Sequence, residues 1–233
     1  MRRLLLLSNS RDEQGRYLHH PREAMAEHFA GVREVLFVPF AGVTVSWDDY
    51  AARVREAFGA LGIAVRAVHD VDDPHGAVAN AEAIAVGGGN TFHLLAQLYL
   101  TGLLGAIRAR ARDGVPYLGW SAGSVVACPT IRTTNDMPIV APPSLDALGL
   151  IRCQLNAHFT DAHPPGFQGE TRRERLAEFV VANPRLPAIG LPEGSWLDVG
   201  GEAASLGGPN AAFVFSADGA RELAPGGDVS DLV

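Results

Sequence analysis

A serine between glycines in the middle of the chain is the first candidate for chemistry. Ser121 lies in the segment GWSAG (119–123), a G-x-S-x-G pattern that follows an apolar run expected to form a strand. Small residues on both sides allow a sharp turn into a helix that begins near Ala122, so the hydroxyl would project from the turn. The pattern also occurs by chance, and a serine after a strand often caps a helix. Ser121 is therefore a candidate nucleophile whose role depends on its neighbours.

A second glycine-rich turn could supply amide donors beside Ser121. Residues 83–86 are apolar and lead into Gly87-Gly88-Gly89-Asn90, after which a helix is expected. The first backbone N–H groups of a helix have no partner inside it. Two such turns side by side could hold an oxyanion.

A serine hydroxyl needs a base within hydrogen-bond distance, and the base needs a group that orients it. Among the eight histidines, His158 ends an apolar strand that follows the serine turn, which places it at the expected sheet edge of Ser121. His163 is the alternative, in a loop just before two prolines. The remaining histidines precede Ser121 on expected helices or turns, where surface or capping positions are typical. His158 is the predicted base.

Two acidic residues could orient His158. Asp136 lies in a long polar loop after the serine helix and would give the chain order Ser, Asp, His of α/β-hydrolases. Glu193 follows an apolar strand and would give Ser, His, Glu. Either carboxylate could fix the imidazole tautomer, while Asp136 could instead form an Asx turn and Glu193 could simply be solvated. We slightly favour Asp136 and keep both in the predicted site.

Strands and helices alternate along most of the chain. This alternation predicts an α/β fold with a mostly parallel sheet and helices on both faces, followed by antiparallel hairpins near the C-terminus. At 233 residues, one α/β domain spanning 1–233 is expected. Ligands in such sheets bind outside the carboxyl ends of the strands. Besides the strand leading into Ser121, we expect strands at 3–8, 34–40, 64–69, 83–86, 151–159 and 188–194, short strands at 196–199, 203–206, 211–215 and 222–223, and helices at 17–30, 47–61, 72–81, 91–113 with a break near Gly102 and Gly105, and 169–181.

Composition and charge restrict the class of partner. With 19 basic and 26 acidic side chains the formal charge is −7, which opposes binding to nucleic acid or to an anionic membrane and favours a small molecule or a peptide. The leucine run near the start is shorter than the roughly 7–15 apolar residues of a signal peptide, and no stretch approaches the roughly 20 residues of a membrane span. Cys128 and Cys153 lack metal-site or redox-motif spacing, so a reducing, cytoplasmic location is expected.

The chain resembles the peptidase E family of serine peptidases, the aspartyl dipeptidases. The resemblance covers nearly the whole chain. It implies a fold like that of class I glutamine amidotransferases with serine in place of cysteine, hydrolysis of dipeptides with N-terminal aspartate, and no metal or other cofactor. The segments that carry it are SNS near the start, VPFAGVT with SWDDY, VGGGNTF, GWSAG, ACPTIRTTNDMPIV, NAHFT, GETRRER, GLPEG and LGGPN.

The resemblance also assigns site residues by position. It implies that Ser121 is the nucleophile and His158 the base, and that Asp136 or Glu193 orients the base. The oxyanion-hole amides would be those of Gly89 and Ala122.

Recognition of an aspartyl side chain by an acidic protein needs local donors. Arg172 matches the family's TR-x-x-R pattern, and a guanidinium can bind a carboxylate with two parallel hydrogen bonds. Arg132 is the other arginine candidate, and Asn90 in the glycine-rich turn is a further substrate-binding candidate. The acid that does not orient His158 could bind the substrate's free amino group.

Two alternatives to a dipeptidase stay open. A cyanophycinase-like hydrolase would release aspartyl dipeptides from a branched polymer and leave free Asp-Leu largely intact. A non-catalytic metabolite-binding module would be stabilised by ligand without turnover, which the presence of a serine, a histidine and both acids disfavours.

Overall fold

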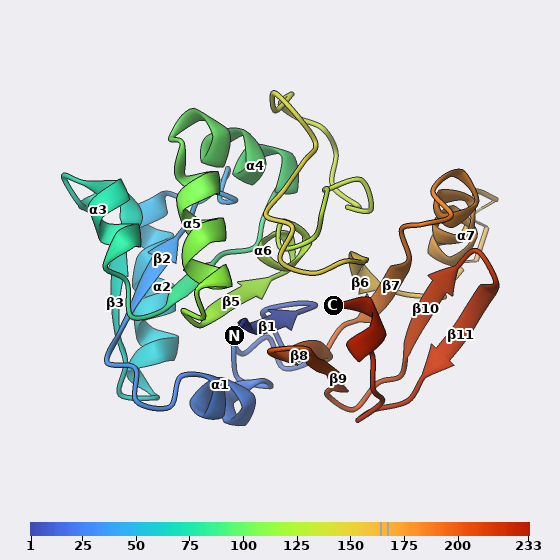
Figure 1. Ribbon diagram of the computed structural model, residues 1–233, viewed down its shortest axis with the longest axis horizontal. Helices are drawn as coiled ribbons and strands as arrows, with labels where there is room; N and C mark the ends of the chain where they lie inside the picture. The colour runs from blue at the N-terminus through green and yellow to red at the C-terminus, as the bar shows by residue number, and fades with distance from the viewer. Residues whose placement is uncertain (164, 167) are drawn as a thin grey trace.

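Parallel strands form the centre of the larger of two sheets in the computed structural model of the chain, which describes residues 1–163, 165–166 and 168–233 (Figure 1). The strand order is β3-β2-β4-β5-β1-β8-β9. Strands β1 to β5 run parallel to one another, and β8, antiparallel to β1, and β9, antiparallel to β8, extend the sheet. The bounds are β1 Arg3–Leu7, β2 Glu34–Val38, β3 Ala64–Ala67, β4 Ile84–Val86, β5 Tyr117–Trp120, β8 Trp196–Gly200 and β9 Ala203–Gly207.

The four consecutive leucines of β1 show why an unbroken apolar run forms a central strand. Leu4 and Leu6 face one hydrophobic cluster, whereas Leu5 and Leu7 face the other, because successive side chains point to opposite sides of a sheet. Helices α3 to α6 contribute to the first cluster, and α1 and α2 to the second. The bounds are α1 Arg22–His28, α2 Trp47–Gly59, α3 Pro74–Ala79, α4 Thr91–Leu100, α5 Leu103–Arg112 and α6 Ala122–Val125.

A smaller sheet, in the order β11-β10-β7-β6, lies beside the larger one (Figure 1). Only β6 and β7 are parallel in it. Helix α7, Arg172–Ala182, packs Leu176 and Val180 against Phe159 and Phe215 of this sheet. The strands are β6 Gln154–Phe159, β7 Ala188–Pro192, β10 Ala212–Ser216 and β11 Gly219–Leu223, and two short 3₁₀ turns span Val68–Asp70 and Ser230–Leu232.

The predicted α/β class is confirmed, with a mostly parallel sheet covered on both faces and antiparallel strands near the C-terminus. The helix expected at 17–30 is shorter, since Tyr17 forms a β-bridge with Arg11 and α1 starts only after Pro21. The helix expected at 91–113 divides at Gly102, whose φ of 71° is in the left-handed region.

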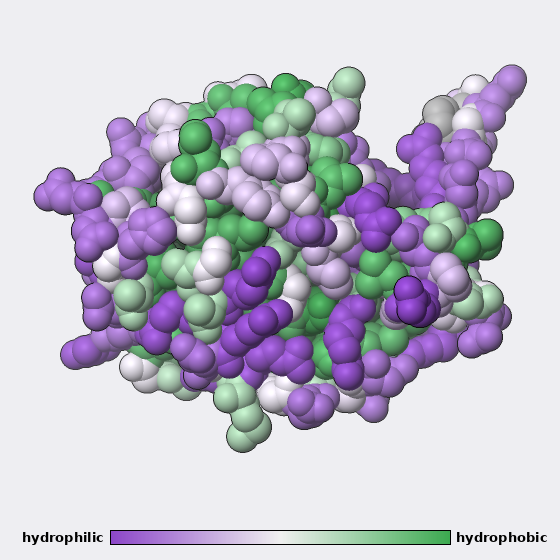
Figure 2. Space-filling view, turned by 45° about the horizontal axis from the view of Figure 1, so that its top comes forward, coloured by the Kyte–Doolittle hydropathy of each residue, from purple (hydrophilic) through white to green (hydrophobic). Residues whose placement is uncertain are grey.

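Hydrophilic side chains are spread over the face shown in Figure 2, with hydrophobic residues in patches between them. This agrees with a chain whose apolar residues are largely used in the clusters beneath the helices. Among the helices of the described residues, none is long and apolar enough to cross a membrane.

Candidate active site

Ser121 lies at the junction of β5 and α6, in a backbone conformation rare for a residue with a side chain. Its φ is 52° and its ψ is −115°. The glycines on either side allow this turn, because a Cβ on Gly119 would overlap the Gly123 carbonyl and a Cβ on Gly123 would overlap the Val86 carbonyl. Such a conformation costs about 1–3 kcal/mol and persists only where the surroundings enforce it. The strain and the close packing present the Ser121 hydroxyl at the sheet edge.

His158 is within hydrogen-bond distance of that hydroxyl, with 2.9 Å between Nε2 and Ser121 Oγ. It has a φ of 55°, and the β6–β7 register shifts between Asn156 and Phe159, as in a β-bulge. Ser8, which follows β1, holds the bulge: its Oγ accepts from the His158 N–H at 2.9 Å and donates to the Leu191 carbonyl at 2.8 Å. The larger sheet therefore fixes the position of the histidine in the smaller one.

Glu193 is the carboxylate that contacts His158, with 2.6 Å between Oε1 and Nδ1. This bond favours the tautomer with the proton on Nδ1, which leaves Nε2 free to accept the Ser121 proton. Glu193 follows β7, the parallel neighbour of β6, so the ends of both strands lie together. Both side chains are reachable by solvent, with 38% of His158 and 64% of Glu193 exposed.

Asp136 lies elsewhere, so the preference for it as the partner of His158 does not agree with the geometry. Its Oδ2 accepts from the backbone N–H of Thr91 at 2.7 Å and from the Thr91 hydroxyl at 2.5 Å. Thr91 is the first residue of α4, where a carboxylate is favoured by the helix dipole. The other oxygen, Oδ1, has no hydrogen bond to a described residue, and Asp136 lines the same cavity as Ser121.

The two predicted oxyanion amides are in suitable turns. Neither the Gly89 nor the Ala122 N–H donates to another described residue. Gly89 has a φ of 141° and is so close to the Ala41 carbonyl that a Cβ would overlap it. The Tyr50 hydroxyl donates to the Gly88 carbonyl at 2.9 Å and accepts from the Trp120 indole N–H at 3.0 Å. This links the glycine-rich turn to the serine turn.

The cavity above Ser121 has a volume of about 590 Å³. Asn90 lines it, as predicted for a substrate-binding residue, and also has a structural task. Its Oδ1 accepts from the His93 N–H at 3.0 Å as the cap of α4, and its Nδ2 donates to the Met137 carbonyl at 2.9 Å. Asn90 and Asp136 together dock the long loop onto the start of α4.

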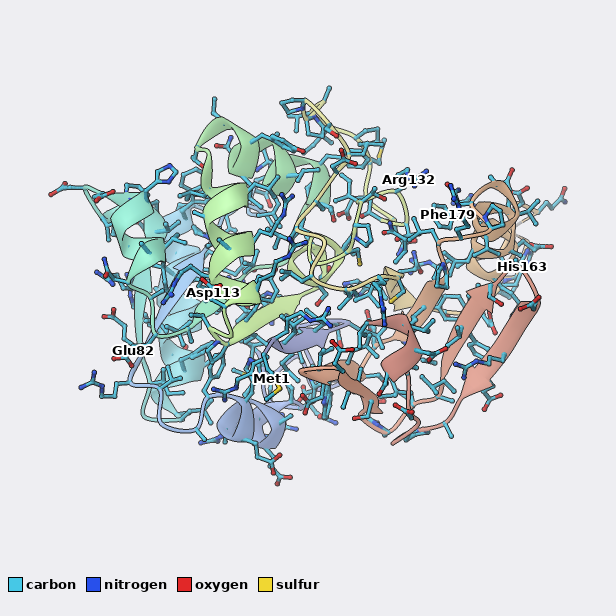
Figure 3. The ribbon with its side chains drawn as sticks, in the orientation of Figure 1. Met1, Glu82, Asp113, Arg132, His163 and Phe179 are labelled. Carbon is cyan, nitrogen blue, oxygen red and sulfur yellow. The ribbon has the colours of Figure 1, made fainter. Side chains whose placement is uncertain are left out.

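The two arginines predicted to bind substrate do not line this cavity. Arg172 donates to the backbone carbonyl of His158, and burial lowers its pKa while the nearby Glu193 charge opposes that shift. Arg132 donates to Asn183 Oδ1 at 2.8 Å and its guanidinium lies 5.4 Å from the Phe179 ring centroid (Figure 3). Arg172 thus supports the backbone of the base, and Arg132 joins the long loop to α7.

The alternative histidine, His163, does not line the Ser121 cavity. It lies in the loop before α7, where its Nε2 is 3.2 Å from the Gly169 carbonyl oxygen (Figure 3).

Ser8 and Tyr50 were not among the residues singled out from the sequence. Tyr50 is on the buried face of α2 and is 5% exposed, and its hydroxyl reaches the glycine-rich turn. Ser8 is fully buried and directly follows the leucine strand. A polar residue at the carboxyl end of a buried strand was the available signal for Ser8.

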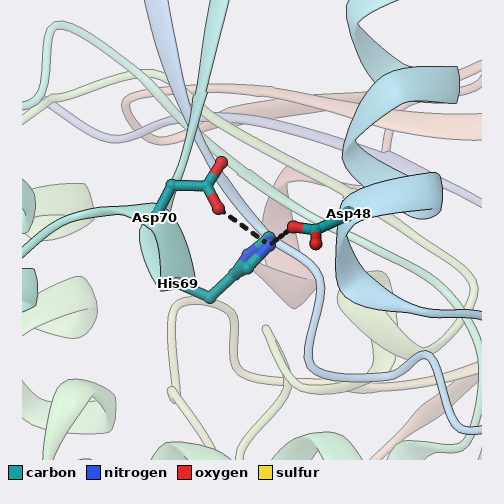
Figure 4. A group of neighbouring side chains, drawn as sticks. All are labelled: Asp48, His69 and Asp70. Carbon is teal, nitrogen blue, oxygen red and sulfur yellow. Dashed lines mark hydrogen bonds and ion pairs between the residues drawn. The ribbon is translucent and has the colours of Figure 1, made fainter.

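One group of side chains in the described residues has the spacing of metal ligands, namely Asp48, His69 and Asp70 (Figure 4). His69 Nε2 lies 3.0 Å from Asp48 Oδ1 and 3.2 Å from Asp70 Oδ1. The Arg55 guanidinium already contacts Asp70 at 2.9 Å, and none of the group lines the Ser121 cavity. These contacts join α2 to the turn after β3, and we assign them no role at Ser121.

A serine, an imidazole and a carboxylate joined by consecutive hydrogen bonds at the edge of an α/β sheet have the arrangement of a serine hydrolase. Comparison with known families is more specific. The model of "Peptidase family S51" matches residues 4–207, so the chain belongs to this family and is a serine-type peptidase.

Curated relatives cover nearly the same length. Peptidase E of Citrobacter koseri is 52% identical over 214 residues, which are 92% of this chain and 93% of the relative. Peptidase E of Escherichia coli strain 536 is 51% identical over 214 residues, again 92% of this chain and 93% of the relative. A solved structure of a peptidase from an acI-B1 actinobacterium is similar in fold, with a TM-score of 0.72 at 19% identity over 98% of this chain and 96% of that one.

Proposed function

We propose that this chain is a serine dipeptidase that hydrolyses dipeptides with N-terminal aspartate through an acyl-enzyme. The observation that carries the proposal is the unbroken series from Ser121 Oγ through His158 to Glu193 Oε1, beside two amides without a described acceptor. The relatives named peptidase E support the dipeptidase reading.

Each step of the proposed hydrolysis uses a named atom of the site. Ser121 Oγ attacks the peptide carbonyl carbon while His158 Nε2 takes the hydroxyl proton, and Glu193 stabilises the resulting imidazolium. The Gly89 and Ala122 N–H groups donate to the oxyanion. The C–N bond then breaks as His158 returns the proton to the leaving amine. Water repeats the sequence on the ester, releases the N-terminal residue and regenerates Ser121.

Asp136 is the proposed partner of the substrate's free amino group. Its Oδ1 is available on the cavity wall, and its Oδ2 is held by Thr91. An ion pair there would select substrates with a free N-terminus beside the scissile bond. The two buried, unpaired cysteines fit the reducing cytoplasm as the place of action.

The test is hydrolysis of Asp-Leu, Glu-Leu, Asn-Leu and N-acetyl-Asp-Leu by the purified chain. We expect Asp-Leu to be the best substrate and N-acetyl-Asp-Leu a poor one, and Ser121→Ala to lower kcat by on the order of 10⁴ or more. Release of dipeptides from a branched aspartyl polymer without cleavage of Asp-Leu would contradict the proposal. So would full activity of the Ser121→Ala variant.

A further inference from the structure

Two arginines outside the predicted site, Arg11 and Arg53, lie on the wall of the Ser121 cavity. Arg53 is on α2 and Arg11 is in the segment after β1, and both are exposed. They lie on either side of one aromatic residue, since their guanidinium carbons are 5.9 Å and 5.8 Å from the Tyr17 ring centroid. Burial raises the pKa of Tyr17 well above its ordinary value, so the phenol stays neutral and compensates neither charge.

Arg53 carries a positive charge that no carboxylate of the described residues neutralises. It makes no hydrogen bond or ion pair within the described part of the chain. Arg55, two residues further along the same helix, pairs with Asp70 at 2.9 Å. In a chain with more acidic than basic side chains, an unpaired guanidinium facing a cleft is a candidate anion site. Arg11 donates one bond, to the Gly15 carbonyl at 2.8 Å, out of five N–H donors.

Both arginines lie close to residues that contact the two turns of the oxyanion site. The Tyr17 ring packs edge-on against Trp120, with centroids 6.3 Å apart, and Trp120 directly precedes Ser121. Arg53 follows Tyr50 by three residues, about one helical turn, and the Tyr50 hydroxyl binds the Gly88 carbonyl. An anion bound by Arg53 would therefore lie on the glycine-turn side of the cavity.

We infer that Arg53, assisted by Arg11, binds the side-chain carboxylate of the N-terminal aspartate and so sets the preference for Asp-Xaa substrates. This inference rests on the proposed function and replaces Arg172 as the specificity residue, because Arg172 bonds to the His158 carbonyl and does not line the cavity. A guanidinium binds a carboxylate with two charge-assisted hydrogen bonds, which an asparagine side chain cannot match.

The test compares Arg53→Gln and Arg53→Lys with the matched control Arg55→Gln on the same helix. Substrates are Asp-Leu, Asn-Leu and Asp-Leu amide, in which the C-terminal carboxylate is neutral. Arg53→Gln should lower kcat/KM for Asp-Leu by about 10- to 100-fold and change Asn-Leu less than about threefold. Arg53→Lys should recover part of the loss, and Arg11→Gln should have a smaller effect, because Arg11 already donates to the Gly15 carbonyl whereas, among the described residues, Arg53 has all its donors available.

Two outcomes would overturn the inference. One is an unchanged Asp-Leu to Asn-Leu ratio in Arg53→Gln. The other is an equal loss on Asp-Leu and Asn-Leu that disappears with Asp-Leu amide, which would place the C-terminal carboxylate at Arg53.

A binding experiment distinguishes failure of this inference from failure of the proposed function. If the wild-type chain cleaves none of the peptides, calorimetry of free L-aspartate and L-asparagine binding to Ser121→Ala still decides the subsite. We expect aspartate to bind more tightly, and Arg53→Gln in that background to remove the difference. Equal binding of the two amino acids to Ser121→Ala would contradict the subsite whatever reaction the chain performs.

Discussion

At the scale of single residues, the two acids near the site have separate tasks. Glu193 bonds to His158 and Asp136 bonds to the start of α4. Glu193→Gln keeps the shape of the side chain but cannot stabilise the imidazolium, so kcat should fall by on the order of 10²–10⁴ with little change in KM. Asp136→Asn should act mainly on KM, because a neutral amide binds an ammonium group weakly. Steady-state kinetics on Asp-Leu measure both.

The opposite pattern would reverse the assignment. If Asp136→Asn loses most of kcat and Glu193→Gln keeps kcat within about tenfold of wild type, then Asp136 orients His158 and Glu193 has no catalytic role. Circular dichroism of both variants controls for loss of the fold.

At the scale of elements, the pairing of two strands decided what the sequence left open. Asp136 and Glu193 both come after the serine turn in the sequence and both lie outside the expected helices, so sequence spacing alone could not show which of them orients His158. The parallel pairing of β6 with β7 sets Phe159 opposite Pro192 and thereby brings Glu193 beside His158. That pairing is a long-range contact with no local signal.

The serine turn, by contrast, was predictable from local chemistry. An apolar strand followed by glycines around Ser121 requires a tight turn, and the complete burial of Leu4 to Leu7 follows from a strand covered on both faces. The prediction of the substrate-binding arginine did not agree with the geometry for the same reason as the preference for Asp136, namely a long-range contact without a local signal. Arg172 stands near His158 in the sequence, whereas Arg53 reaches the cavity only through the packing of α2 beneath the glycine-rich turn.

Ser8 gives a test of how the two sheets hold the base together. Ser8→Ala removes the acceptor of the His158 N–H and the donor to the Leu191 carbonyl, both in a buried position. The free energy of unfolding should fall by about 1–3 kcal/mol, and kcat should fall while KM changes little, since the imidazole loses its support. Denaturant unfolding and kinetics measure the two effects.

Ser205→Ala, an exposed position on β9, is the matched control and should shift stability by less than about 0.5 kcal/mol. A Ser8→Ala variant that loses stability but keeps wild-type kcat would mean that Ser8 only joins the sheets.

At the scale of the whole molecule, the acid sensitivity of the fold should depend on a histidine outside the site. His28 at the end of α1 is 9% exposed, its Nε2 has no hydrogen-bond partner among the described residues, and Arg3 donates to its carbonyl at 2.6 Å. Burial and, secondly, the Arg3 charge lower the pKa of His28 from 6.5 to about 4. The unfolded chain therefore takes up a proton at a pH where the folded chain does not.

The sign of the effect follows from that difference. Between the unfolded value of 6.5 and the folded value of about 4, the unfolded state holds more protons, so stability is present above pH 6.5 and is lost as the pH falls toward 4. The loss between pH 7 and pH 4 amounts to about 3 kcal/mol from this group. His28→Gln should remove that share, so the wild-type minus variant difference in unfolding free energy should shrink by about 3 kcal/mol over this range. A difference that stays constant with pH would show that His28 is protonated equally in both states, and that the acid sensitivity of the fold arises from its carboxylates.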